Sequence, residues 1–367
     1  QGGNPRSEGF TAGPLLIFLL LGMNHPFFGF LTLGMCRSSH RGLGNRKSLA
    51  SPAAGGRGES MSCTVLGGGV SGLSTGIKLL ERSLEVHLVA EKLSPETVSD
   101  TAAAWWYPFL VEPLIKTNRW SSESFGEFVR LMDEEGLDFI TMRMGREYLK
   151  RPCSAPGWSE SIDHFRILEE HEVIDGYSFG WEIEAPVIEM AYYMPWLRSR
   201  FESLGGTIET RKISNFDELE SNLIINCSGL GAREICRDEE VVPVRGQVVY
   251  IQQDPGFGRY DQQPESLIYT IPRRDVTVLG GTAQKDDWTI EVRKKDEEDI
   301  LEKCESLWPE LDRSKIVGRA VGLRPSRTEV RLESEYLNGK RVIHNYGHGG
   351  AGVTLSWGCA DEVLRMI

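Results

Sequence analysis

Short apolar stretches and one helical repeat organise the start of the folded part. Residues 63–66 and 85–89 are apolar runs of strand length, and each predicts a buried strand. Between them Leu73, Ile77 and Leu80 recur at the spacing of one helix face. The pattern therefore predicts a strand, a helix and a second strand in close succession.

Two further strands are predicted where apolar residues run into glycines. Residues 223–225 lead into Gly229-x-Gly231, and Val342-Ile343 leads into four glycines within 347–352. An amphipathic helix is expected after the second loop, over 354–366. Strand, glycine loop and helix together bring main-chain N–H groups close to an anionic ligand. The alternative for the turn at 229–231 is a tight connection that holds no ligand.

The loop between the first two strands carries a sharper signal. Gly67-x-Gly69-x-x-Gly72 joins the strand to the helix, and Glu91 follows about 20 residues later, which is the dinucleotide-binding pattern. Gly67 allows the tight turn, Gly69 the approach of a pyrophosphate, and Gly72 close packing of helix on strand. The pattern does not separate FAD from NAD, and its alternative is a glycine turn without ligand.

The amino-acid composition limits the classes to which the protein can belong. The 367 residues are 40% hydrophobic and 26% charged, which suits a globular chain with a sizeable core and two domains. A net charge of −12 argues against nucleic acid as a partner. The seven cysteines are odd in number and include no Cys-x-x-Cys, so we expect reduced thiols and no metal site.

The first sixty residues differ from the rest. Apolar runs at 15–21 and 27–33 are interrupted by Asn24-His25-Pro26, so neither predicts a transmembrane helix or a stable membrane association. Residues 1–60 are expected to be a leader or a disordered extension, and Met61 to open the folded unit.

Four segments together resemble one family. Residues 67–72, 100–108, 322–333 (Gly-Leu-Arg-Pro-Ser-Arg at their start) and 345–354 (with Tyr-Gly-His-Gly-Gly) are similar to the D-amino-acid oxidase / D-aspartate oxidase family, and the resemblance covers 62–367. It implies a mixed α/β fold, in which a Rossmann-like FAD-binding domain is interleaved with an antiparallel-sheet substrate domain. The FAD-binding parts would be about 61–110, 205–235 and 318–367, and the substrate parts about 111–204 and 236–317.

The resemblance also implies the chemistry. A D-amino acid would be oxidised to an imino acid with FAD as cofactor, water would release a 2-oxo acid and ammonia, and O₂ would be reduced to hydrogen peroxide. Arg324 would bind the substrate carboxylate in bidentate fashion, the Tyr269 hydroxyl would join it, and the Gly350 carbonyl would accept from the amine. Phe109 would also contact the substrate. No general base is assigned, and His348 is interpreted as part of the loop scaffold.

Cofactor contacts follow from the same resemblance. The residues implied for FAD are Gly67, Gly69, Val70, Ser71, Gly72, Glu91, Lys92, Thr97, Ser99, Ala103, Ala104, Trp105, Ile213, Ser228, Gly349, Gly350, Ala351, Gly352, Val353 and Thr354.

The chain departs from the family pattern near Tyr269. Glu265 stands where many members have a second tyrosine, and the connection 252–266 is short and rich in turn formers, which suggests a reduced lid and easier product release. Trp105, Tyr107 and Phe109 either face the pocket or belong to the core.

Ala283 follows Gly280-Gly281-Thr282, where D-aspartate-preferring relatives tend to have an arginine. Neutral D-amino acids are therefore the expected substrates, unless Arg273 or Arg274 reaches a second carboxylate.

Other functions stay open at this point. They are a D-aspartate oxidase, a glycine or small-amine oxidase on the same fold, a non-catalytic FAD-binding protein, and an NAD-dependent dehydrogenase. The resemblance suggests a peroxisomal enzyme, with the cytoplasm as the alternative because the chain ends at Ile367 without the usual tripeptide. It leaves a homodimer open.

Overall fold

The structure is a computed structural model that describes residues 61–367, apart from 110 and 264–265. The predictions for residues 1–60 and for Glu265 lie outside the described residues. The helices are α1 (Val70–Glu81), α2 (Leu114–Asp133), α3 (Met190–Ser203), α4 (Ala232–Ile235), α5 (Lys294–Leu307) and α6 (Gly352–Met366). The strands are β1 (Ser62–Leu66), β2 (Glu85–Ala90), β3 (Ile140–Leu149), β4 (Phe165–Ile167), β5 (Phe179–Ile188), β6 (Thr207–Thr210), β7 (Leu223–Asn226), β8 (Val242–Ile251), β9 (Gly258–Asp261), β10 (Ile268–Pro272), β11 (Thr277–Gly280), β12 (Gln284–Lys285), β13 (Ile316–Leu337) and β14 (Lys340–His348).

All fourteen strands belong to one sheet with two different halves. The order is β4-β5-β3-β9-β10-β11-β8-β13-β14-β7-β1-β2-β6, and β12 pairs with β8. From β14 to β6 neighbouring strands are parallel, whereas from β4 to β13 they are antiparallel except for β3 with β9. We call these the parallel half and the antiparallel half. The mixed α/β prediction is confirmed, and β1, α1 and β2 form at the predicted positions.

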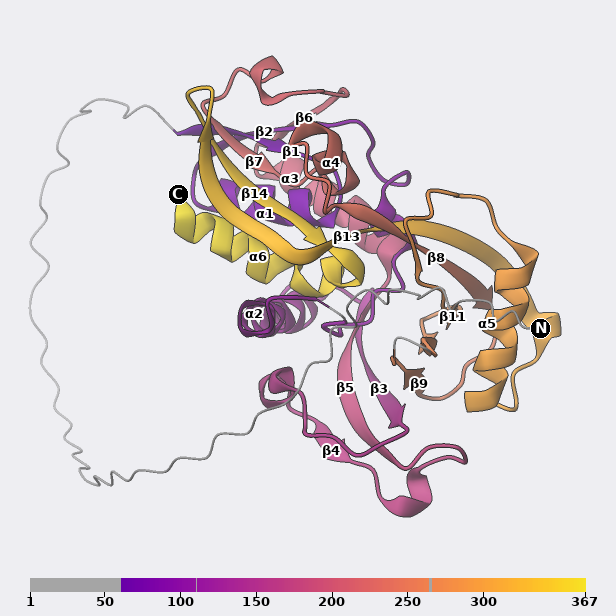
Figure 1. Cartoon of the computed structure of the whole chain (residues 1–367). Coiled ribbons are helices and arrows are strands. Elements are labelled where there is room, and N and C mark those ends of the chain that lie inside the picture. The colour runs from indigo at the N-terminus through magenta and orange to yellow at the C-terminus, as the bar shows by residue number, and fades with distance from the viewer. Residues whose placement is uncertain (1–60, 110, 264–265) are drawn as a thin grey trace, which may run out of the picture. The chain divides into compact units, whose positions relative to one another are not determined.

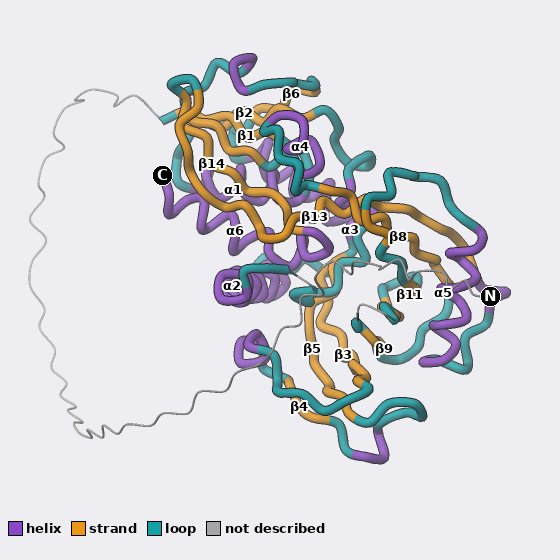
Figure 2. The backbone as a smooth tube through the Cα atoms, viewed as in Figure 1, coloured by secondary structure: helices purple, strands orange, loops and turns teal. Residues whose placement is uncertain are grey.

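A single long strand joins the halves. The first part of β13, Ile316–Ser326, pairs with β8, and its last part, Arg331–Leu337, pairs with β14. The register shifts between Ser326 and Arg331, so the strand bends there. Figure 2 shows β13 running from one half into the other. Arg324 therefore lies at the junction.

Helices cover the parallel half. α1 and α6 pack against each other, with α2 beside α6 and α3 beside α1, as Figure 1 shows. Ser74 Oγ donates to the Ser356 carbonyl oxygen at 3.2 Å, which fixes α1 to α6. Leu73 and Ile77 are buried as their spacing predicts, whereas Leu80 is only half-buried. The predicted domain boundaries stay predictions, because the described part of the chain forms one sheet.

Strand alternation gives the antiparallel half two faces. Tyr269, Val278 and Val248 lie in the main core, on the face toward the cofactor loops. Their sequence neighbours Ile268, Leu279 and Val249 pack instead against α5. The connection expected to be a turn-rich loop, 252–266, contains β9, which bridges β3 and β10. No helix of the described residues is long and apolar enough to cross a membrane.

Candidate active site and cofactor cradle

Close backbone approaches explain the glycines of the first loop. Gly67 has φ of +116°, and a Cβ there would lie 2.3 Å from the carbonyl oxygen of Cys227. A Cβ at Gly72 would lie 2.0 Å from the carbonyl oxygen of Gly67. Neither position can hold a side chain without a backbone shift. The loop is thereby held tightly between β1, β7 and α1.

The N-terminus of α1 is open toward an anion. Gly69 is its N-cap and provides no side chain, and the Val70 N–H donates to Ser99 Oγ at 3.0 Å. The N–H groups of Ser71 and Gly72 have no hydrogen-bond acceptor among the described residues. Free N–H groups and the helix dipole together favour a phosphate. Thr97 fixes the neighbouring turn by donating to Asp100 from both its N–H and its hydroxyl, at 2.9 and 2.6 Å.

The end of β2 offers a charged rim. Glu91 and Lys92 are exposed there, and Glu91 lies 3.8 Å from Lys212. Ile213 is buried in a cluster with Leu66, so only its main chain is available to a ligand. Glu91 and Lys92 follow the carboxyl end of β2, and Ile213 follows that of β6. Dinucleotides bind at the carboxyl ends of the strands in such sheets.

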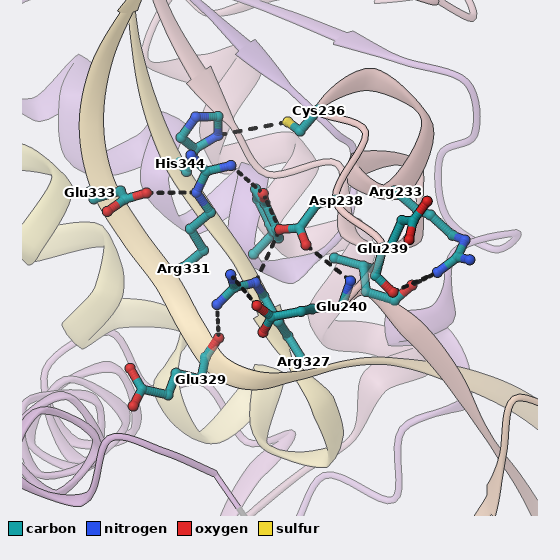
Figure 3. A network of polar contacts seen from close by, with 12 residues as sticks. Arg233, Cys236, Asp238, Glu239, Glu240, Arg327, Glu329, Arg331, Glu333 and His344 are labelled. Carbon is teal, nitrogen blue, oxygen red and sulfur yellow. Dashed lines mark hydrogen bonds and ion pairs between the residues drawn. The ribbon is translucent and has the colours of Figure 1, made fainter.

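The turn after β7 lies against the first loop. Ser228 Oγ and N–H both donate to Asn226 Oδ1, at 2.7 and 3.2 Å, and the Ser228 Cα would lie 3.3 Å from a Cβ at Gly67. The segment that follows is anchored to β13: Arg327 donates to Asp238 at 3.0 Å, as Figure 3 shows among a wider network. This network holds the turn, β13 and β14 in fixed relation.

The segment 102–109 is pinned from two sides. Arg273 Nη2 donates to the carbonyls of Ala102 and Ala103 at 2.6 and 2.7 Å. The Thr354 hydroxyl of α6 accepts from the Tyr107 N–H at 3.2 Å and donates to its carbonyl at 3.1 Å. Ala104 adopts a positive φ of 56° between these anchors. The anchors place the segment along the first turn of α6.

The C-terminal glycine loop rests on a buried histidine. His348 Nε2 lies 3.0 Å from Asn345 Oδ1, and the Asn345 amide donates to Thr75 on α1 at 3.2 Å. Burial lowers the pKa of His348 to about 4, so the ring is neutral at physiological pH. This geometry fits the scaffold interpretation of His348. Above it, Gly349 to Val353 enter α6, whose N-cap Ala351 makes no side-chain capping bond.

Two of the three aromatic candidates belong to the core. The Trp105 ring stacks on Tyr260 with centroids 3.7 Å apart, and Tyr107 donates to Glu147 at 2.6 Å. Trp181 donates to the same carboxylate oxygen at 3.0 Å. Burial raises the pKa of Glu147 to about 7, against the lowering effect of these two hydrogen bonds.

Arg324 projects from β13 over a glycine of β8. A Cβ at Gly246 would lie 2.3–2.4 Å from the Arg324 guanidinium, so only glycine leaves room for it. Its Nη1 donates to the Thr282 carbonyl at 2.8 Å. No ion pair of Arg324 occurs within the described residues. A half-buried guanidinium therefore keeps donors that a carboxylate could accept.

Tyr269, Gly350 and Phe109 converge on this arginine. The Tyr269 ring lies over Gly280 and Gly281, whose Cβ positions would come within 2.0–2.9 Å of it. Burial raises the pKa of Tyr269, and the neighbouring Arg324 opposes that rise. A Cβ at Gly350 would contact Phe109 at 3.4 Å and the Arg324 side chain at 3.5 Å. Four residues from distant segments thus meet at one place.

The two other arginines near β10 are already engaged. Arg273 holds the carbonyls of 102 and 103, and Arg274 bonds the Asp138 carbonyl and lies 3.2 Å from the Asp138 carboxylate. The Arg274 N–H also donates to Glu189 at 2.9 Å. Both guanidiniums are held by these partners, and Arg273 keeps a buried Nε without a hydrogen-bond partner in the described part of the chain.

Comparison with known proteins decides what this arrangement belongs to. Residues 62–366 match the family described as FAD dependent oxidoreductase. The chain belongs to this family. The expected resemblance is thereby confirmed, and FAD is the cofactor.

Named relatives agree with the family, and a solved structure agrees with the fold. The chain is 40% identical to a D-amino-acid oxidase of Rubrobacter xylanophilus over 82% of this chain and 94% of the relative. It is 33% identical to the D-aspartate oxidase of Homo sapiens over 83% of this chain and 93% of that protein. The fold is similar to that of glycine oxidase from Bacillus cereus, with a TM-score of 0.69, 17% identity and coverage of 84% and 94%.

The residues present fit FAD in this oxidoreductase. The glycine loop before α1 leaves the close approach that a pyrophosphate needs, and the exposed Glu91 suits a ribose hydroxyl. The first turns of α1 and α6 both lack a side-chain cap. Residues 67–72, 91–92, 97, 99, 103–105, 228 and 349–354 would hold the cofactor, with Ile213 contributing only its main chain.

The supporting roles of some residues of the site do not follow from the sequence. Gly246 and the Gly280-Gly281 pair make room for the Arg324 and Tyr269 side chains, and Arg273 fixes the segment 102–109. Gly-Gly next to a tyrosine-bearing strand was a usable signal. The sequence around Gly246 contains no such signal, because the role of this glycine depends on the pairing of β8 with β13.

Proposed function

We propose that the protein is a D-amino-acid oxidase. The observation that carries the proposal is Arg324, a half-buried cation without a carboxylate partner in the described part of the chain, beside Tyr269 and Gly350. A substrate α-carboxylate would supply the missing anion. The reaction converts a D-amino acid, water and O₂ into a 2-oxo acid, ammonia and hydrogen peroxide.

Each residue has a positioning role. Arg324 and the Tyr269 hydroxyl hold the carboxylate, and the Gly350 carbonyl accepts a hydrogen bond from the amine. Bound FAD supplies a hydride acceptor that O₂ can reoxidise. Two fixed points on the substrate aim its Cα–H in one direction, which is the main contribution of the protein to the rate.

Replacing Arg324 tests this role. Arg324→Lys keeps a positive charge and loses the planar fork, so kcat/KM for D-alanine should fall about a hundredfold, or ~3 kcal/mol. The matched control is Arg319→Ala on the same strand, which pairs with Glu297 at the surface. Both variants should keep the flavin absorbance. An Arg324→Lys enzyme that oxidises D-alanine as fast as the parent would overturn the assignment.

D-amino acids with neutral side chains are the proposed substrate preference of the enzyme. It is supported by the engagement of Arg273 and Arg274 with main-chain and carboxylate partners. If these two arginines keep their partners, a second carboxylate beside them would be desolvated without a partner, which is costly.

A second candidate, an oxidase for acidic D-amino acids, is favoured by one residue. Arg143 lies on β3 two residues before Gly145, on the face that meets Trp105 and Tyr260. Its Nε is buried and makes no hydrogen bond among the described residues. Rates on D-alanine and D-aspartate separate the two candidates. The second candidate is supported if D-aspartate is the better substrate and if Arg143→Met lowers the rate on D-aspartate without lowering the rate on D-alanine.

The proposal extends to a homodimer and to the peroxisome. Peroxisomal location comes from the family resemblance, and microscopy of the untagged protein with a specific antibody would test it against the cytoplasm.

A further inference from the structure

One fully buried histidine of the parallel half contacts the turn after β7 through a side-chain amide. His344 lies on β14 and pairs in register with Asn226 of β7, which is also fully buried. His344 Nδ1 lies 3.2 Å from Asn226 Nδ2 and 3.9 Å from Cys236 Sγ, and Figure 3 shows the contact with the sulfur. His344 Nε2 lies 2.7 Å from Glu335 Oε1. Both ring nitrogens therefore have polar partners inside the protein.

The direction of these hydrogen bonds follows from the Ser228 end. The Ser228 N–H can only donate, and it meets Asn226 Oδ1 at 3.2 Å, as the Ser228 hydroxyl does at 2.7 Å. The side-chain oxygen of Asn226 therefore faces Ser228, and its NH₂ group faces Cys236 and His344. Since an amide NH₂ group can only donate, His344 Nδ1 accepts and carries no hydrogen.

The Glu335 end requires the same tautomer. Glu335 Oε1 accepts from Arg331 Nη2 at 3.0 Å and also meets His344 Nε2. A carboxylate only accepts, so the hydrogen of the imidazole ring lies on Nε2. Burial lowers the pKa of His344, against the raising effect of Glu335, which favours the neutral ring. One chain of hydrogen bonds thus runs from Glu335 through His344 and Asn226 to Ser228.

Ser228 is the point at which this chain of bonds reaches the cofactor loops. Its Cα would lie 3.3 Å from a Cβ at Gly67, and the Cys227 carbonyl oxygen would lie 2.3 Å from the same position. The Cys227 N–H donates to the Leu66 carbonyl oxygen at 2.8 Å. The turn that carries Ser228 is therefore packed against the first glycine loop, and the Asn226 amide sets the direction of its N–H and hydroxyl groups.

We propose that His344 is a positioning residue for FAD, because it fixes the Asn226 amide and thereby the orientation of Ser228. With Nδ1 as an acceptor, only one orientation of the amide satisfies the groups on both of its sides. Without that acceptor the amide can turn, and the Ser228 N–H would then face an NH₂ group. This role depends on FAD as the cofactor and not on the substrate that is oxidised.

The FAD affinity of the full chain tests this role in the absence of any substrate. The Kd is measured from the quenching of flavin fluorescence on binding. His344→Leu removes the acceptor and should raise the Kd about tenfold, because a buried donor of Asn226 loses its partner. His344→Asn also loses the Glu335 contact but keeps an oxygen acceptor near the position of Nδ1. Its Kd should stay within about threefold of the parental value.

His87→Leu is the matched control for loss of a histidine. His87 lies on β2 of the same half, and its ring nitrogens contact Thr207 and Glu209 of β6 at 2.8 and 3.2 Å. Neither contact leads to Ser228, so this variant should bind FAD as the parent does. A His344→Leu variant with the parental Kd, or a His344→Asn variant that binds as weakly as His344→Leu, overturns the proposal.

The tautomer of His344 gives a readout that a loss of packing does not change. Nitrogen–proton NMR of the flavin-loaded parent, labelled at its histidines, should show hydrogen on Nε2 of His344 and none on Nδ1. The His344 signal is identified by its disappearance in His344→Asn. A hydrogen on Nδ1 overturns the proposal even if His344→Leu fails to fold, because the ring could not then accept from Asn226.

Discussion

The parallel and antiparallel halves of the sheet build their parts of the site by different means. In the parallel half, glycines at 67 and 72 let main-chain atoms come together, and the first turns of α1 and α6 present N–H groups. In the antiparallel half, side chains such as Arg324 and Tyr269 reach across neighbouring strands. A cofactor held by backbone depends on local sequence, whereas a substrate held by side chains depends on strand register.

Two buried titratable groups, one in each half, have opposite consequences. Burial lowers the pKa of His348 to about 4 in the parallel half and raises that of Glu147 to about 7 in the antiparallel half. Both groups are therefore favoured in their neutral forms. A fall in pH below 6.5 should destabilise the first region, and a rise in pH from 4.5 to 7 the second.

The largest expected effect is in the cofactor loop. Gly72→Ala would place a Cβ 2.0 Å from the Gly67 carbonyl oxygen, which only a backbone shift relieves. We expect the purified variant to lose most of its FAD, measured as the ratio of flavin to protein absorbance. Gly126→Ala on α2 is the control, since no atom lies within 4 Å of its Cβ position. Full flavin content in the Gly72→Ala variant would contradict the backbone-held cradle.

The corresponding glycine of the antiparallel half should separate binding from activity. The three atoms nearest to a Cβ at Gly246 belong to the end of the flexible Arg324 side chain, which can move away. Gly246→Ala should keep its FAD and lose about a hundredfold in kcat/KM, ~3 kcal/mol, because the carboxylate ligand is displaced. Loss of flavin in this variant would mean that the two halves are not independent.

The same contrast explains what the sequence could predict. The glycine loops, β1, α1 and β2 are local patterns, and all formed where the spacing of residues placed them. Arg324 and Tyr269 came from short motifs of the family, and the structure brings them together. Their supporting residues did not come from any local pattern.

Those supports depend on pairing between distant segments. Gly246 matters because β8 lies beside β13, and Glu147 matters because Tyr107 reaches it from 40 residues away. Trp105 was open between pocket and core, and its stacking on Tyr260 follows from the position of β9. β9 itself lies in a connection rich in turn residues, so its short strand left no clear apolar pattern.

Glu147 gives a pH signature to the antiparallel half. Its folded pKa of about 7 lies above its ordinary 4.5, so the folded state binds the extra proton and loses stability as pH rises from 4.5 to 7. The difference corresponds to ~3 kcal/mol. Glu147→Gln still accepts from Tyr107 and Trp181, so its Tm should exceed that of the parent at pH 8 and match it at pH 5. Glu170→Gln, at an exposed site, is the control and should leave the Tm unchanged at both pH values. A Glu147→Gln variant whose Tm depends on pH as that of the parent does would refute the buried-acid interpretation.

His348 should give the opposite and smaller signature. Its folded pKa of about 4 lies below the ordinary 6.5, so the unfolded state binds the proton first and stability falls as pH drops from 6.5 toward 4. At pH 5 this amounts to ~2 kcal/mol. His348→Gln can still donate to Asn345 without titrating, so the fall in Tm between pH 7 and pH 5 should be smaller than in the parent. His171→Gln, an exposed control, should keep the parental slope. If both variants keep that slope, His348 does not limit the acid stability of the glycine loop, and the loop would owe its position to α1 and α6 alone.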